Sequence, residues 1–427
     1  MSIRKIKVRA LSLAITMIFS SLANSSPNVG NQPSSHQQQA IEKYFNGLVA
    51  EEKIAGATIA TLNNKSKQVS SFGYLDKENS IPMPNDALIP LGSMTKIVTA
   101  VAIMQLYEQG LLALNDPVDK YIPAFSNLRV ASNPEQSAEQ QVKTEALNRK
   151  ITILDLLTHT AGLTYSGLTF SGKVTVSDIL YQRAGFLQWR QPLSKFVDAV
   201  TQLPLAYQPG ADFEYSLAYD VLGCLIEIVS KQRLEHYFKD NIFIPLEMEK
   251  TAFYAQKNWP LSNLYTFDNG KLRLDENRLS SRYLSVPPVN SAGGGWSDSY
   301  CGLISTADDY YKLLEMLLNY GAHNKKQIIS KQSVLLMTTN HVGNLAHADL
   351  GDDVGYGIGM GVVDGQATRT EQQSNYVFWS GAPYNNYFWI DFEAHQIGLM
   401  LTNTGPYGNQ DIIDHFKRFS QKYSNTK

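Results

Sequence analysis

The segment that decides the fold is LGSMTKIVTA, residues 91–100, in which Ser93 and Lys96 stand three residues apart at the start of an apolar run. Residues three apart on a helix share a face, so a helix that begins here brings the Lys96 amine within reach of the Ser93 hydroxyl. A lysine amine beside a serine hydroxyl can accept its proton, which activates the serine as a nucleophile. Ser93 and Lys96 are therefore the first candidates for a catalytic pair.

The same Ser-x-x-Lys spacing occurs twice more, at Ser2/Lys5 and Ser424/Lys427, so the spacing alone does not choose among the three. The first pair lies in an N-terminal targeting segment and the last ends a polar C-terminus. The middle pair follows a glycine and opens a helix with apolar residues around most of its circumference, as expected of a core helix. This context selects Ser93.

Residues 1–23 have the composition of a secretory signal peptide. Four basic residues precede an apolar run that ends at Phe19, and the small-x-small sequence Ser21-Leu22-Ala23 follows. The apolar run is shorter than the roughly 20 residues that span a bilayer, which disfavours a membrane anchor. We expect cleavage near Ala23, export to the periplasm or the medium, no membrane span in the mature chain, and a flexible linker over residues 24–36.

Composition restricts the partners. With 43% hydrophobic and 18% charged residues, the 427-residue chain is of the globular class. Removing the four basic residues of the signal segment makes the formal net charge of −2 more negative, which argues against nucleic acid as a partner. The eight histidines include no metal-binding pair with the His-Glu-x-x-His spacing, so we expect no metal and no other cofactor. Pairing of Cys224 with Cys301 and the oligomeric state stay open.

The chain has strand-like segments at both ends and helical patterns between them. The expected strands are an N-terminal hairpin and three strands of an antiparallel sheet, at residues 57–62, 68–74, 376–381, 387–391 and 397–403. Amphipathic helices at residues 37–53 and from about Gln410 are expected to pack on this sheet. We predict an α+β sheet domain (37–92 and 297–423), an inserted, mainly helical domain (93–296) and a tail (424–427).

An activated serine also needs a second proton carrier and two amide donors for the oxyanion. Tyr215 lies on a loop before a helix for which Ser216 is the predicted N-cap. Trp379-Ser380-Gly381 ends a strand, and Gly381 would allow a substrate to approach the backbone closely. The backbone N–H groups of Ala382 and Ser93 are the expected oxyanion donors.

Taken together, these residues resemble the penicillin-recognising serine hydrolases, which include class C β-lactamases, D-alanyl-D-alanine carboxypeptidases and family VIII carboxylesterases. Further segments in the family's order extend the resemblance over nearly the whole mature chain: DPVDKYIP, LLTHTAGL, QPGADFEYS, IPLEMEKTAF, CGLISTADD and FWSGAPYNNYFWID. The resemblance implies an α/β (α+β), β-lactamase/transpeptidase-like fold. It also implies Ser93 as nucleophile, Lys96 and Tyr215 as the proton-handling pair, and an acyl-enzyme that water hydrolyses. Whether Lys96 or Tyr215 is the acylation base stays open.

Two departures from the family pattern concern the substrate. Leu217 replaces the asparagine of the family's Tyr-x-Asn, and Trp379 replaces the lysine of its Lys-Thr-Gly. A side-chain amide and a cation are thereby lost, which favours neutral acyl substrates and resembles the carboxylesterase branch. We therefore expect a serine hydrolase acting on small-molecule esters. The alternatives are a β-lactamase or D-alanyl-D-alanine carboxypeptidase, which would act on an amide, and a non-hydrolysing penicillin-binding-like protein.

Two further residues have structural interpretations. His159, in LLTHTAGL, has no task in a serine–lysine–tyrosine scheme, so we expect it to hold a loop through hydrogen bonds. Glu247 stands where the family usually has glycine, which we expect to affect only a turn. The sequence has no G-x-S-x-G segment, which disfavours a Ser-His-Asp hydrolase.

Overall fold

The structure is a computed structural model that describes residues 36–63, 66–167, 172–186, 191–276, 291–294, 302–363, 376–406 and 409–421. The predicted signal peptide, the linker up to residue 35, Cys301 and the C-terminal tail lie outside these ranges. In the described ranges, every helix is too short or too polar to cross a membrane.

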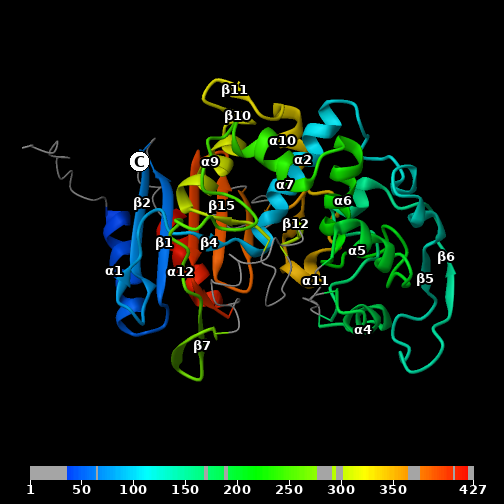
Figure 1. Cartoon of the computed structure of the whole chain (residues 1–427), viewed down its shortest axis with the longest axis horizontal. Coiled ribbons are helices and arrows are strands. Elements are labelled where there is room, and N and C mark those ends of the chain that lie inside the picture. Colours follow the sequence, from blue (N-terminus) through cyan, green and yellow to red (C-terminus); the bar gives the residue numbers. More distant parts are fainter. Residues whose placement is uncertain are drawn as a thin grey trace, which may run out of the picture.

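One antiparallel sheet is built from both ends of the chain (Figure 1). Its strand order is β12-β13-β14-β15-β16-β1-β2-β3. The strands are β1 (Gly56–Asn63), β2 (Ser66–Asp76), β3 (Ile81–Pro82), β12 (Val354–Tyr356), β13 (Gly361–Val363), β14 (Tyr376–Gly381), β15 (Asn386–Asp391) and β16 (Gln396–Thr402). Strand β1 pairs with both β2 and β16, so the N-terminal hairpin continues the C-terminal strands. The predicted hairpin and the three predicted C-terminal strands are confirmed.

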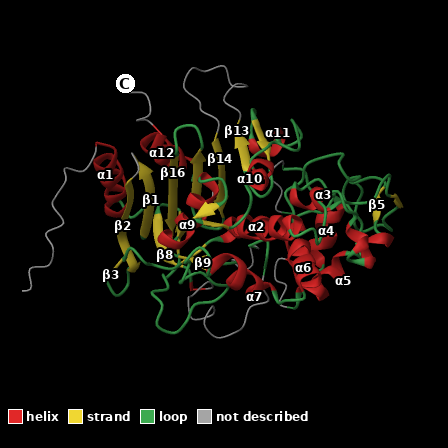
Figure 2. Cartoon of the chain, turned by 90° about the horizontal axis from the view of Figure 1, so that it is seen from above, coloured by secondary structure: helices red, strands yellow, loops and turns green. Residues whose placement is uncertain are grey.

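Helices cover both faces of this sheet (Figure 2). Helices α1 (His36–Ala50) and α12 (Gln410–Gln421) pack on one face, and α9 (Ala307–Leu318) packs on the other. Successive strand residues point to opposite faces. In β1, Ile59 therefore joins the cluster formed with α1 and α12, whereas Ala60 joins the main core. The prediction that the first and last helices pack together on the sheet is confirmed.

The remaining helices lie beside the sheet (Figure 1). They are α2 (Thr95–Glu108), α3 (Ile153–Leu157), α4 (Val176–Arg183), α5 (Leu193–Val200), α6 (Ala218–Ser230), α7 (Leu234–Phe238), α10 (Lys331–Met337) and α11 (His347–Leu350). Every residue of α2 from Thr95 to Leu106 is buried, which confirms the predicted core helix. Helix α3 begins with the predicted capping interaction, in which Thr152 and Asp155 each bond the other's backbone N–H.

Further short strands pair with one another outside the main sheet. The pairs are β4 (Ile89–Pro90) with β9 (Ile304–Ser305), β5 (Arg129–Ala131) with β6 (Thr144–Ala146), β10 (Ala322–His323) with β11 (Lys326–Gln327), and β7 (Tyr265–Asp268) with β8 (Lys271–Leu274) and β17 (Thr404–Gly405). The β7–β8 hairpin turns at the Asp268-Asn269-Gly270 sequence. The β4–β9 pair ends directly before the turn that carries Ser93.

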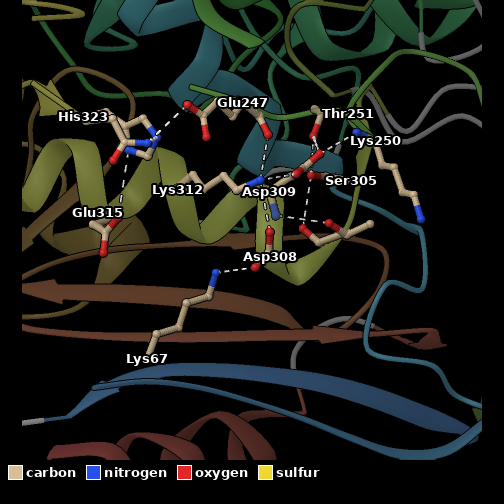
Figure 3. A network of polar contacts seen from close by, with 12 residues as sticks. Lys67, Glu247, Lys250, Thr251, Ser305, Asp308, Asp309, Lys312, Glu315 and His323 are labelled. Carbon is tan, nitrogen blue, oxygen red and sulfur yellow. Dashed lines mark hydrogen bonds and ion pairs between the residues drawn. The ribbon is translucent and has the colours of Figure 1, made fainter. Parts of the chain in front are cut away.

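A polar network at the start of α9 joins the segment at Lys250 and Thr251 to β9 and to α9 (Figure 3). The buried Asp309 carboxylate accepts hydrogen bonds from the Lys250 backbone N–H, at 2.6 Å, and from the Thr251 hydroxyl, at 3.1 Å. The Thr251 hydroxyl also lies 2.7 Å from that of Ser305. Because these contacts fix β9 and β9 pairs with β4, the network positions the backbone that leads into Ser93.

Glu247 lies at the edge of the same network (Figure 3). Its φ of +59° is in the left-handed region, where a side chain is disfavoured and glycine is not. The Glu247 carbonyl accepts a hydrogen bond from Lys312 Nζ, at 2.6 Å. The departure from glycine at this position therefore lies in a turn, as the sequence predicts.

Candidate active site

Ser93 lies on a short 3-10 turn (Gly92–Met94) that leads directly into α2. This arrangement places Lys96 Nζ 3.4 Å from Ser93 Oγ. The Lys96 side chain is fully buried, and this burial lowers its pKa to about 7, while the charge of Asp220 opposes the shift. A substantial fraction of Lys96 is therefore unprotonated at neutral pH and able to accept the hydroxyl proton.

Backbone contacts fix the turn that carries Ser93. Tyr310 on α9 donates a hydrogen bond to the Met94 carbonyl, at 2.9 Å. Asn386 at the start of β15 donates to the Pro90 carbonyl, at 2.7 Å. Both donors are buried side chains, so the position of Ser93 is set by the sheet and by α9 rather than by the turn alone.

Tyr215 lies next to the Lys96 amine. Lys96 Nζ is 4.5 Å from the centre of the Tyr215 ring, and Tyr215 itself is almost completely buried. The ring stacks on Tyr165 at a centroid distance of 5.5 Å and touches Trp379 at 5.4 Å. The structure thus brings the three sequence-predicted catalytic candidates, Ser93, Lys96 and Tyr215, into one cluster.

His159 holds the segment that carries Tyr215. Its Nδ1 accepts a hydrogen bond from the Ser216 backbone N–H, at 3.1 Å, and lies 3.0 Å from Ser216 Oγ. Burial, with a smaller effect of the Lys96 charge, lowers the pKa of His159 well below its usual value, so the ring is neutral. The expected loop-holding role of His159 is confirmed, but the prediction that Ser216 caps α6 is wrong. The N-cap is Leu217, and the Ser216 hydroxyl is oriented toward His159 instead.

The end of β14 lies against the Ser93 turn. A Cβ atom on Gly381 would be 2.0 Å from the Leu91 carbonyl oxygen, so this position requires glycine. Strand β15 pairs with all of β14, but β13 pairs only with its first half, up to Phe378. Among the described strands, the segment Trp379–Gly381 is therefore paired on one side only, which gives a substrate a strand edge beside Ser93.

A cavity of about 250 Å³ opens at this edge. Its described lining combines five predicted site residues, Ser93, Tyr215, Trp379, Ser380 and Ala382, with further aromatic side chains. The other lining residues are Asp349, Leu350, Val354, Tyr376, Phe378, Tyr387, Gln410, Ile413 and Lys417. Leu217, a predicted substrate-site residue because it stands in the place of the family's asparagine, is buried in the main core and is not among these lining residues.

Sequence reasoning missed the two charged residues of this lining. Asp349 lies on α11 and Lys417 on α12, and neither belongs to a motif. Lys417 Nζ lies over the rings of Phe378 and Tyr387, 5.3 and 5.0 Å from their centres. Burial lowers the pKa of Lys417, and the charge of Asp414 opposes this. No local pattern marks these residues, because the fold brings them to the cavity from distant parts of the chain.

Sequence reasoning also missed Asp220, which lies on α6 beneath Lys96. A signal was present, because Asp220 comes directly before the mainly apolar helical segment VLGCLIEIV (residues 221–229), and a carboxylate is costly to bury there without a partner. Burial raises the pKa of Asp220, while Lys96 and hydrogen bonds from Ser291 and Gly293 lower it. The Gly293 carbonyl in turn accepts a hydrogen bond from Lys96 Nζ.

The described ranges contain no group of three or more His, Cys, Asp or Glu side chains placed to hold a metal ion. Cys224 is a buried free thiol on α6, and burial raises its pKa to about 12. It is therefore protonated at neutral pH. The question of its pairing with Cys301 lies outside the described residues.

The antiparallel sheet, the helices beside it and the Ser93–Lys96 turn between them define a β-lactamase-like fold, the fold of a class of hydrolytic and acyl-transfer enzymes. A family model described as Beta-lactamase matches residues 41–421. The chain belongs to this family. The resemblance to the penicillin-recognising serine hydrolases and the predicted fold class are thereby confirmed.

Two relatives and one solved structure illustrate this similarity. Protein Rv1367c of Mycobacterium tuberculosis is 33% identical over 314 residues, which are 72% of this chain and 74% of that protein. Esterase EstB of Burkholderia gladioli is 26% identical over 389 residues, 85% of this chain and 90% of that protein. The structure of EstCE1, described as a hydrolase with promiscuous acyltransferase activity, has a TM-score of 0.75 at 24% identity and covers 90% of this chain and 98% of its own.

Proposed function

We propose that this protein is a serine hydrolase that cleaves carboxylic esters through an acyl-enzyme on Ser93. One observation carries the proposal: Ser93 lines a cavity, and its hydroxyl lies 3.4 Å from the buried Lys96 amine, whose pKa is lowered to about 7. A base with a pKa near the working pH is effective in general base catalysis, because it is both available and basic.

The proposed reaction has two steps. The Ser93 hydroxyl proton passes to Lys96, with Tyr215 as the second member of the proton-handling pair, while Ser93 Oγ bonds to the ester carbonyl carbon. The carbon–oxygen bond to the alcohol then breaks, and the alcohol leaves with that proton. Tyr215 then takes a proton from water, whose oxygen bonds to the acyl carbon. The bond from this carbon to Ser93 Oγ breaks, Oγ regains the proton, and the acid leaves.

The oxyanion that forms in each step would accept hydrogen bonds from the backbone N–H groups of Ser93 and Ala382. Support comes from the contact between the two segments, since Gly92 and the Ala382 carbonyl are in direct backbone contact. Donors held this rigidly need no reorganisation when the charge develops, which is the main requirement of an oxyanion hole.

The residue at position 379 favours neutral acyl substrates. Trp379 occupies the place of the family's lysine and packs on Tyr215, at 5.4 Å, and on Tyr356, at 5.1 Å. The relative EstB is named an esterase, which supports the same substrate class. The promiscuous acyltransferase activity ascribed to EstCE1 adds acyl transfer as a further outcome, in which an alcohol replaces water in the second step.

A second candidate is hydrolysis of a β-lactam or a D-alanyl-D-alanine amide. The observation in its favour is the family match over residues 41–421. Leu217 and Trp379 count against it, because they remove an amide and a cation that would bind such substrates. A third candidate, a non-hydrolysing penicillin-binding-like protein, would form a slow acyl adduct on Ser93, or none, without turnover.

The deciding experiment compares three substrates on the purified protein: p-nitrophenyl butyrate, a chromogenic cephalosporin and a D-Ala-D-Ala peptide. We expect the protein to turn over the ester. In Ser93→Ala, kcat/KM for the ester should fall by about 10³-fold or more. Ser424→Ala, in another Ser-x-x-Lys sequence, is the matched control and should remain fully active. Full esterase activity in Ser93→Ala would refute the proposal, and stoichiometric labelling without turnover would favour the third candidate.

We also propose that the mature protein is exported after cleavage near Ala23. The support is the charge and apolar pattern of residues 1–23. N-terminal sequencing of protein recovered from a bacterial periplasm or culture medium should begin at about residue 24. Recovery of the exported protein with residues 1–23 intact would contradict this.

A further inference from the structure

We infer that Asp220 is a positioning residue of the active site, which holds the Gly293 carbonyl against the Lys96 amine. The Asp220 Oδ1 atom accepts hydrogen bonds from the Gly293 backbone N–H, at 3.2 Å, and from the Ser291 hydroxyl, at 2.9 Å. The other side of the Gly293 residue contacts Lys96, since the Gly293 carbonyl accepts a hydrogen bond from Lys96 Nζ. Asp220 thus acts on the lysine through one backbone residue.

Segment 291–294 is packed too closely to shift independently of these contacts. The Thr99 hydroxyl on α2 donates to the Ala292 carbonyl, at 2.8 Å. A Cβ on Gly293 would lie 2.7 Å from Asp220 Oδ2, and a Cβ on Gly294 would lie 2.0 Å from the Gly92 carbonyl oxygen. The segment therefore connects Asp220 to Lys96 on one side and to the Ser93 turn on the other.

The amine needs such a fixed acceptor. A lysine side chain has four rotatable bonds, and an ammonium group has three donors that can turn in several directions. The contacts with the Gly293 carbonyl and with Ser93 Oγ together fix the direction of Nζ. Misplacing a catalytic group by about 1 Å can cost about 10²-fold in rate, so holding Nζ in place has a kinetic consequence.

Asp220 also differs in charge from the other groups around Lys96. The facing groups are Tyr219 on α6, Tyr215 and Tyr165 on the adjoining loops, and His159, which burial keeps neutral. Among the described residues, Asp220 is the carboxylate whose charge acts on Lys96, and it raises the pKa of the amine against the effect of burial. Asp220 reaches Lys96 through the Gly293 residue and is not among the described residues that line the cavity, so it is a positioning residue and not a catalytic one.

The test is Asp220→Asn, which keeps the shape of the side chain and removes its charge. The readout is kcat and kcat/KM for p-nitrophenyl butyrate from pH 5 to pH 9. We expect kcat to fall about tenfold with little change in KM, because Lys96 is less firmly held. The limb of the pH profile that Lys96 controls should move to lower pH by about one unit, because the charge that raises its pKa is gone.

The shift to lower pH is expected whether Lys96 acts as the base or as a cation beside Tyr215. In the first case the rising part of the pH profile follows the pKa of the amine, and in the second case the falling part does. The matched control is Cys224→Ala, a buried change one turn further along α6 that leaves the limb in place. If Asp220→Asn does not fold, Gly293→Ala replaces it. Its methyl group displaces the Asp220 carboxylate from the Gly293 peptide and should lower kcat about tenfold.

The inference rests on the proposed function, and the two fail differently. An active Ser93→Ala protein would overturn both. If Ser93→Ala is inactive but Asp220→Asn keeps the wild-type kcat and the wild-type pH profile, only the role of Asp220 is overturned. Wild-type kcat in Gly293→Ala would do the same.

Discussion

Gly92 and Ala382 are in backbone contact, because a Cβ atom on Gly92 would lie 1.9 Å from the Ala382 carbonyl oxygen. The φ angle of Gly92, +55°, is also one that other residues rarely adopt. This contact joins the turn that carries Ser93 to the end of β14. It thereby sets the spacing of the two N–H groups that we propose as oxyanion donors.

Gly92→Ala should therefore damage both stability and activity. We expect a loss of about 2–4 kcal/mol in unfolding free energy, from backbone strain and from the displaced Ala382 carbonyl. We also expect a fall of about 10²-fold in kcat/KM, comparable to the loss of one oxyanion donor. Urea unfolding and esterase kinetics measure the two effects.

Gly110→Ala is the matched control for this prediction. Gly110 also has a positive φ, of +69°, but no atom lies within 4 Å of a Cβ placed there. This variant should lose about 1 kcal/mol of stability through strain alone and keep its kcat/KM. Equal kinetics in the two variants would show that the contact with Ala382 has no catalytic importance.

The pH dependence of catalysis should follow Lys96. Burial lowers the pKa of this amine to about 7, so the fraction able to accept the Ser93 proton rises as the pH passes through this value. With Lys96 as the acylation base, kcat/KM for p-nitrophenyl butyrate should rise about tenfold from pH 6 to pH 8. A profile that falls over this range would instead assign the base role to Tyr215, with Lys96 acting as the cation.

Glu214 should make the stability of the protein decrease with pH. Burial raises its pKa from 4.5 to about 9, and the charges of Asp349, Asp178 and Asp212 add to the shift. The native carboxyl group therefore keeps its proton in a pH range where the unfolded chain has lost it. The contribution of Glu214 to the free energy of unfolding is complete below about pH 4.5. It falls by at most about 1.4 kcal/mol per pH unit as the pH rises from there, and it is lost once the pH has passed through about 9.

Glu214→Gln removes this titration and should flatten the dependence of the unfolding free energy on pH. Urea unfolding at pH 5, 7 and 9 is the measurement. Glu249→Gln, at an exposed site, is the control and should leave the wild-type slope unchanged. A Glu214→Gln protein with the wild-type slope would show that Glu214 is ionised in the native state at neutral pH.

The sequence predicted those parts of the fold and site whose signals are local. The alternating strands, the apolar helix after Ser93 and the capping sequence at Thr152 each formed as expected, because a few neighbouring residues determine them. Ser216 was mispredicted for the same reason: its helix-capping tendency is local, but a buried histidine 57 positions earlier in the chain provides a competing partner.

The residues that sequence reasoning missed depend on long-range packing. Asp220 and Gly293 are 73 positions apart, and Asp349 and Lys417 reach the cavity from two separate helices. Leu217 shows a different case, because its motif position suggests a place near the substrate and its side chain packs in the main core. Periodicity and motif spacing specify elements and pairs close in sequence, and they do not specify which distant side chains meet.

Replacing Glu247 by glycine should stabilise the protein. The residue has a φ of +59° and is exposed, so glycine relieves backbone strain without opening a cavity. The Lys312 contact is with the backbone carbonyl and remains, whereas the side-chain contact with Asn324, at 3.2 Å, is lost. We expect a net gain of about 0.5 kcal/mol in urea unfolding.

Glu247→Ala is the control for Glu247→Gly. It loses the same side-chain contact but keeps a Cβ atom, so it should show no gain in stability. A gain of equal size in both variants would assign the effect to the removed charge or side chain rather than to the backbone.

Substitutions of Trp379 test the proposed reason for a preference for neutral substrates. The Trp379 ring lines the cavity and packs on Tyr215 and Tyr356. It stands at the position where the β-lactamases and carboxypeptidases that the sequence resembles are expected to have a lysine cation. Trp379→Lys restores that cation and Trp379→Leu removes the ring without adding charge, so both lose the aromatic packing and only one gains an ion-pair partner. Both variants should lose about 3 kcal/mol or more of stability, as is usual when a buried Trp is truncated.

The informative quantity is a ratio of kcat/KM values. It compares a p-nitrophenyl ester whose acyl chain ends in a carboxylate with p-nitrophenyl butyrate, so the shared loss of packing cancels. We expect this ratio to be about tenfold higher in Trp379→Lys than in Trp379→Leu, which corresponds to about 1.4 kcal/mol for one partly solvated charge pair. Equal ratios would mean that a charge at position 379 does not reach the acyl chain, and that the preference for neutral substrates must come from elsewhere in the lining.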